Sequence, residues 1–138
     1  RYLGRISGPL TDRIDIHIEV PPISYDKLTS DTHGESSSKI KKRVDRAREI
    51  QMERYRDEEI FYNDQLTSRL INRYCQLSRE AKSMLKEAFK DLNLRSRAHS
   101  RILKVGRTIA ALEGSKLIEE EHIGEAIQYR SLDREYWL

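Results

Sequence analysis

The chain has 138 residues, of which 37% are hydrophobic and 36% charged, a balance that excludes a disordered tail. Its excess of 26 Lys and Arg over 23 Asp and Glu is small, and the acidic residues are interleaved with the basic ones. Solvated helix faces therefore account for the charge better than a dedicated phosphate-binding surface does. The single cysteine, Cys75, excludes an internal disulfide. No apolar run approaches the ~18 residues of a membrane span and no signal peptide is visible, so we expect a soluble, cytoplasmic protein.

Residues 14–20 are expected to form a β-strand. Through this stretch β-branched residues alternate with polar ones, and two prolines end it: Ile14, Ile16, Ile18 and Val20 against Asp15, His17 and Glu19. No second convincing strand follows. Because a lone strand cannot satisfy its own backbone groups, we expect its partner strands to lie outside this sequence and the chain to be a fragment.

Residues 21–38 lack periodicity and are rich in turn-forming residues, which is typical of a linker. Five helical segments are expected after it. The first, at about 38–58, has a narrow apolar stripe made of Ile40, Val44, Ala47, Gln51 and Tyr55. A short one follows at about 68–75, with Thr67 as its N-cap.

The last three helices have clearer signals. The third begins after Ser78 and repeats apolar residues at spacings of three and four. The fourth begins after Ser96 and stops at Gly114, and Gly106 inside it predicts close helix packing. The fifth, at about 119–130, starts with three glutamates, which the helix dipole favours there. We therefore expect a mainly α fold, a small helical bundle preceded by an orphan β-strand.

An ordered set of short motifs runs along the chain. It comprises Ser7-Gly8-Pro9-Leu10-Thr11-Asp12-Arg13-Ile14-Asp15, Gly34-Glu35-Ser36-Ser37, Ser96-Arg97-Ala98, Arg107-Thr108-Ile109-Ala110 and Ala126-Ile127-Gln128-Tyr129-Arg130. Each motif alone is weak, but the set closely resembles the magnesium-chelatase-like AAA+ ATPases, which include chelatase subunit I and the ComM and YifB types. Thr11 departs from the second Leu of the family's first motif, and Gly106 from its usual Ala.

This resemblance implies a domain organisation. Residues 1–20 would be the C-terminal edge of an incomplete AAA+ core, 21–38 a linker and 39–138 the helical lid domain. The complete protein would use ATP and Mg²⁺ and work as a homo-oligomeric, hexameric ring. No phosphate-binding loop of the form Gly-x-x-x-x-Gly-Lys and no Walker-B strand occurs here. We therefore expect this chain alone to bind no cofactor and to hydrolyse no ATP.

The resemblance implies that Arg13 is an arginine finger, which reaches the ATP held by the neighbouring subunit. Spacing alone favours a simpler interpretation, a surface arginine paired with Asp12 or Asp15.

The resemblance also implies that Arg97 is the sensor-2 arginine, which contacts the ATP phosphates of its own subunit. With Ser96 as N-cap, Arg97 lies in the first turn of the fourth helix. The positive end of the helix dipole disfavours a cation there and favours an anion nearby. Pairing with a nearby acid is the alternative, and Arg95 or Arg101 could be the sensor instead.

Weaker candidates remain. The histidines show no metal-ligand spacing, so no zinc site is expected at His17, His33, His99 or His122. A basic cluster on the first helix is either a solvated face or a DNA-binding surface: Lys41, Lys42, Arg43, Arg46 and Arg48. The alternative function is thus a basic helical DNA-binding module. A third is a chelatase-like role in which the ring remodels a partner protein.

Overall fold

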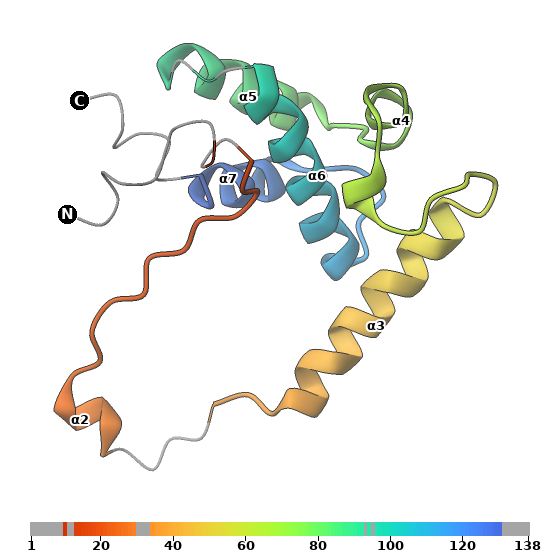
Figure 1. Ribbon diagram of the computed structural model, residues 1–138. Coiled ribbons are helices and arrows are strands. Elements are labelled where there is room, and N and C mark those ends of the chain that lie inside the picture. The colour runs from red at the N-terminus through yellow and green to blue at the C-terminus, as the bar shows by residue number, and fades with distance from the viewer. Residues whose placement is uncertain (1–9, 11–12, 30–33, 93, 95, 131–138) are drawn as a thin grey trace.

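The computed structural model describes residues 10, 13–29, 34–92, 94 and 96–130. In order along the chain, its helices are α2 (Tyr25–Leu28), α3 (Ser37–Arg54), the 3₁₀ turn η2 (Asn63–Gln65), α4 (Ser68–Tyr74), α5 (Arg79–Asp91), α6 (Ser96–Glu113) and α7 (Glu120–Gln128). α6 is central, with α3, η2, α4 and α7 packed against it, and α5 packs on α7 (Figure 1). The predicted mainly α fold is confirmed.

The core is formed by the apolar faces of α4 to α7 and the segments between them. Ala81, Ile102, Ile118, Ile123 and Ala126 are completely buried there. Cys75 is part of this cluster, as the sequence predicts, and burial raises the pKa of its thiol to about 11. The thiol therefore stays protonated at neutral pH and is no nucleophile. None of the helices in the described residues is long and apolar enough to cross a membrane.

The predicted helix ends are largely confirmed. Ser78 caps α5 by accepting the amide of Ala81 at 3.2 Å. Gly114 follows α6 with φ of 74°, and the amide of Ser115 donates back to the carbonyl of Ala110 at 2.8 Å. This Schellman-type ending uses the left-handed conformation that glycine adopts without strain. Ser96 is the first residue of α6 rather than its cap, which leaves Arg97 in the first turn.

Two loops that are separated in the sequence by α5 and α6 are hydrogen-bonded to each other. Leu77, before α5, forms an isolated parallel bridge with Ile118, before α7. The amide of Ile118 donates to the carbonyl of Gln76 at 2.8 Å, and the amide of Ser78 donates to Ile118 at 3.0 Å. The starts of α5 and α7 are thereby fixed side by side.

α3 differs from its prediction. It ends at Arg54 instead of near residue 58, and Ile40 and Val44 are 43% and 41% exposed although their spacing predicts burial. Ala47, Gln51 and Tyr55 are buried as expected. The N-terminal end of α3 extends beyond the bundle, so the described residues give the first half of the stripe little to pack against (Figure 1). α2 adds one helical turn inside the predicted linker.

Residues 14–20 do not form a strand, because the described residues offer them no partner strand. A strand at residues 14–20 stays a prediction for a longer chain that supplies the partner strands. The alternation also does not set burial here: Ile14, Ile16 and Ile18 are exposed, whereas His17, on the polar face, is only 6% exposed. The segment instead lies against the end of α7, where the amide of His17 donates to the carbonyl of Tyr129 at 2.7 Å.

Candidate functional site

Arg97 lies on the exposed side of the first turn of α6. That turn contains no acidic residue, and Arg97 forms no ion pair with any residue in the described part of the chain. The alternative in which Arg97 merely pairs with a nearby acid therefore finds no support in these residues. A solvent-exposed arginine beside the free N–H groups of a helix N-terminus is suited to hold an anion such as a phosphate.

The alternative sensors are placed differently. Arg101, about one turn further along α6, pairs with the carboxylate of Asp15. Arg95 lies outside the described residues. Of the three arginines near the start of α6, Arg97 is thus the one that the structure describes as exposed and without an ion pair to the described residues.

Arg13 is exposed, and its amide donates to the carbonyl of Leu10 at 3.0 Å. Asp15, one of the two acids that could neutralise it, is engaged by Arg101. The other, Asp12, lies outside the described residues. Arg13 and Arg97 therefore sit on two segments that the Asp15–Arg101 pair joins.

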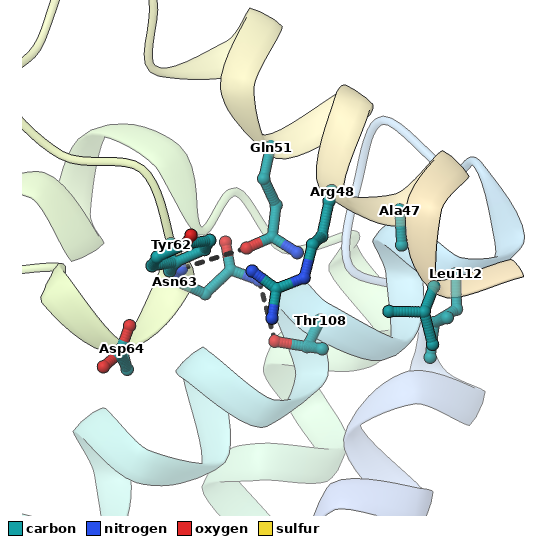
Figure 2. A pocket seen from close by; sticks show the side chains of 9 residues that line it. Ala47, Arg48, Gln51, Tyr62, Asn63, Asp64, Thr108 and Leu112 are labelled. Atoms are coloured by element: carbon teal, nitrogen blue, oxygen red, sulfur yellow. Dashed lines mark hydrogen bonds between the residues drawn. The ribbon is translucent and has the colours of Figure 1, made fainter. Parts of the chain in front are cut away.

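A hollow of about 450 Å³ lies between α3, η2 and α6, and three of its lining residues, Gln51, Asn63 and Thr108, belong to one hydrogen-bond network (Figure 2). The amide of Asn63 donates to Gln51 Oε1 at 3.1 Å, and Asn63 Nδ2 donates to Thr108 Oγ1 at 2.7 Å. The hydroxyl of Tyr55 donates to Asn63 Oδ1 at 2.6 Å. Asn63 thus holds α3 on α6, and neither predicted site arginine lines this hollow.

A group of possible metal ligands occurs at the start of α7, where atoms of Glu113, Glu121 and His122 lie within 4.8 Å of one another. His122 Nδ1 accepts the amide of Glu119 at 2.9 Å, so the proton of a neutral ring is on Nε2, which donates to Glu113 at 2.8 Å. A metal binds an unprotonated imidazole nitrogen, and both nitrogens are engaged. His122 therefore fixes the N-terminus of α7 and is not arranged as a metal ligand.

The basic cluster on α3 is partly neutralised. Lys41 pairs with Asp45 at 2.5 Å, and Arg43 pairs with Glu35 at 2.8 Å. The guanidinium of Arg48 lies 4.6 Å from the ring centroid of Tyr62. This arrangement agrees with the solvated-face interpretation and does not favour a DNA-binding module.

The structure thus has a helical bundle with exposed Arg97 at the start of its central helix, and a preceding segment with exposed Arg13. Comparison with known families assigns this chain to one of them. The chain belongs to the family of magnesium chelatase subunit ChlI. The model of the C-terminal region of that subunit matches residues 34–130, and the model of magnesium chelatase subunit ChlI itself matches residues 1–28. The recognition made from the sequence motifs is confirmed.

Among individual proteins, the chain is 42% identical to the competence protein ComM of Haemophilus influenzae over 135 residues, which are 97% of this chain and 26% of ComM. It is 40% identical to the YifB proteins of Salmonella typhimurium and Escherichia coli, again over 97% of this chain and 26% of the relative. The chain thus spans about a quarter of the length of the curated relatives it matches.

Sequence reasoning missed several residues that organise the bundle. Arg107 is 1% exposed and donates to the carbonyls of Ser115 and Lys116 at 2.6 and 2.7 Å. Arg130 is buried and donates to the carbonyl of Ile14 at 3.0 Å. Arg107 follows Leu103 by four residues on the apolar side of α6, so its helical position was a usable signal. Arg130 stands in one of the motifs, but no local signal predicts its contact, because its partner lies 116 residues away in sequence.

Proposed function

We propose that this chain is the helical lid, with the adjoining edge of the ATPase core, of a ring-forming AAA+ ATPase of the ComM and YifB type. The complete protein binds ATP and Mg²⁺ in a homo-oligomeric, hexameric ring. Within it, Arg97 contacts the phosphates of the ATP held by its own subunit. Arg13 acts as an arginine finger on the ATP of the neighbouring subunit.

The position of Arg97 carries this proposal. A cation in the first turn of a helix is opposed by the dipole, and no acidic residue in that turn compensates it. An anionic ligand removes the conflict and gains the free N–H groups of the turn as well. The family match supports a nucleotide phosphate as that anion.

The position of Arg13 supports the second role. Its side chain is exposed, and the nearby Asp15 is taken up by Arg101. Phosphoryl transfer builds negative charge on the transferred group, and an arginine supplied by a neighbouring subunit can stabilise it. An exposed arginine beside an acid engaged elsewhere is free to serve a site on another subunit.

The test replaces Arg97 by Ala in the full ATPase that contains this segment. We expect nucleotide affinity to fall by about tenfold or more, because a charge-assisted hydrogen bond to phosphate is lost, and turnover to slow as well. Affinity is measured with a fluorescent ATP analogue and turnover by phosphate release.

Arg79→Ala is the matched control, since Arg79 is likewise an exposed arginine in the first turn of a helix, α5. It should leave both quantities unchanged. If Arg97→Ala binds nucleotide as well as Arg79→Ala does, the sensor assignment is wrong.

DNA binding by α3 stays an untested alternative. A DNA-binding surface would show as salt-dependent binding of this chain to duplex DNA, with affinity falling steeply as salt rises. Because Lys41 and Arg43 already have acidic partners, we do not favour it over the ATPase role.

A further inference from the structure

Three interactions tie the segment that carries Arg13 to the helical bundle. Asp15 pairs with Arg101 on α6, the amide of His17 donates to the carbonyl of Tyr129 at 2.7 Å, and Arg130 donates to the carbonyl of Ile14 at 3.0 Å. Each joins residues that are far apart in sequence, 86 apart for Arg101 and Asp15 and 116 for Arg130 and Ile14. The segment is therefore held at a defined place by α6 and by the residues that follow α7.

These polar interactions, more than apolar packing, define the register of the segment. Ile14, Ile16 and Ile18 are exposed, so they contribute little burial, whereas His17 and Arg130 are only 6% and 4% exposed. A hydrogen bond that is shielded from water holds its partners better than one at the surface. Removal of one partner would thus shift the segment without removing much of the core.

The two joined elements are the ones that carry the proposed nucleotide-contacting arginines. Arg101 lies about one turn after Arg97 on α6, and Asp15 lies two residues after Arg13. A displacement of α6 therefore pulls directly on the segment of Arg13. The Asp15–Arg101 pair is a direct contact through which such a displacement would reach the segment.

We propose that Asp15, Arg101 and Arg130 are positioning residues that link the nucleotide state of the lid, sensed at Arg97, to the placement of Arg13 at the neighbouring subunit. This inference rests on the proposed function. It assigns to Arg101 a role through Asp15 rather than a contact with phosphate. It also predicts that loss of the link slows turnover while the subunit's own nucleotide affinity is kept.

The test is a charge exchange in the full ATPase. Asp15→Arg and Arg101→Asp should each lower kcat by about tenfold, because each places like charges together and displaces Arg13. The double variant Asp15→Arg/Arg101→Asp should recover most of the lost kcat. Affinity for the fluorescent ATP analogue should stay within about twofold of the original in all three.

The matched control exchanges the charges of the Lys41–Asp45 pair. Like Asp15–Arg101, this pair joins a basic residue to an aspartate, but both of its residues lie on α3. Lys41→Asp/Asp45→Lys should leave kcat unchanged. If the double variant at Asp15 and Arg101 is no more active than the poorer single variant, the positioning role is overturned. If Arg101→Asp lowers nucleotide affinity and the double variant does not restore that affinity, Arg101 is a phosphate contact instead.

Failure of the proposed function gives a different result. If Arg13→Ala turns over ATP normally, the finger assignment fails whatever the charge exchange shows. If Arg13→Ala is inactive but Asp15→Arg and Arg101→Asp are fully active, the finger stands and the link does not.

A measurement on the 138-residue chain keeps the inference testable where a variant fails to assemble. The amide of His17 should exchange with solvent at least about tenfold more slowly than in the unfolded chain. Arg130→Gln should abolish this protection while the amides of α6 stay protected. An unprotected His17 amide in the unaltered chain would overturn the link directly.

Discussion

Arg107 is a buried cation that backbone carbonyls hold in place of an acid. Its guanidinium donates to Ser115 and Lys116, just beyond the C-terminal end of α6, where carbonyl oxygens lack helical partners. Burial lowers the pKa of Arg107 to about 10, with a further contribution from the neighbouring Arg54, so the group is still charged at pH 7. The side chain thereby shapes the loop that carries Ile118 into the core.

We predict that Arg107→Leu lowers the free energy of unfolding by about 1–3 kcal/mol, because two carbonyls lose a charged donor. Arg107→Lys should lose less, since it keeps the charge but one ammonium reaches the two carbonyls less well. Urea unfolding of the chain measures both. A Leu variant as stable as the original would mean that the desolvation of the guanidinium outweighs its hydrogen bonds.

At the scale of the helix, Gly106 and Gly124 look alike in sequence but have different surroundings. A Cβ at Gly106 would lie 3.3 Å from Ile118 Cγ2 and 3.3 Å from Ile123 Cδ1. Both isoleucines are completely buried, so the close-packed core leaves them little room to move aside. A Cβ at Gly124 would meet Met84 Sδ at 3.6 Å, an ordinary contact with a flexible side chain.

We predict opposite signs for the two substitutions. Gly124→Ala should stabilise the chain by about 0.5–1 kcal/mol, the usual gain in helix propensity. Gly106→Ala should destabilise it by about 1–2 kcal/mol, because overpacking outweighs that gain. The two urea midpoints decide, and a shift of both in the same direction would contradict the packing difference.

At the scale of the assembly, the two arginines are expected to act on different ATP molecules. In the proposed function, Arg97 contacts the ATP of its own subunit, and Arg13 contacts the ATP of the neighbouring subunit. An arginine finger is worth about a thousandfold or more in turnover. Arg13→Ala should therefore abolish hydrolysis while it leaves ATP binding largely intact, unlike Arg97→Ala.

We predict that a mixture of inactive Arg13→Ala and Arg97→Ala subunits regains part of the turnover. In mixed rings, some interfaces join a subunit with an intact Arg97 to a neighbour with an intact Arg13. Phosphate release before and after subunit exchange measures this, with exchange followed by energy transfer between labelled subunits. No recovery despite proven exchange would mean that the assignment to own and neighbouring subunit is wrong or that all interfaces must act together.

Local patterns were sufficient for the helices α4 to α7 and most of their ends. Ser78 and Gly114 specify a cap and a left-handed turn through their own side-chain and backbone chemistry, and the spacing of apolar residues in α5 and α6 specifies which face is buried. The motif that includes Arg97 likewise lies in the first turn of α6 as predicted. Its role, and that of Arg13, stays a proposal.

What the sequence by itself determined is therefore the mainly α bundle, the helix boundaries to within a few residues and the family. Only the tertiary structure decided that Ile40 and Val44 stay exposed, that His17 and Arg107 are buried, and that Asp15 pairs with Arg101. The physical reason is that helix propensity and capping act over a few residues, whereas burial and ion pairing depend on which distant segment the fold brings near. A periodic stripe shows which face of a helix is apolar, but not whether anything lies against it.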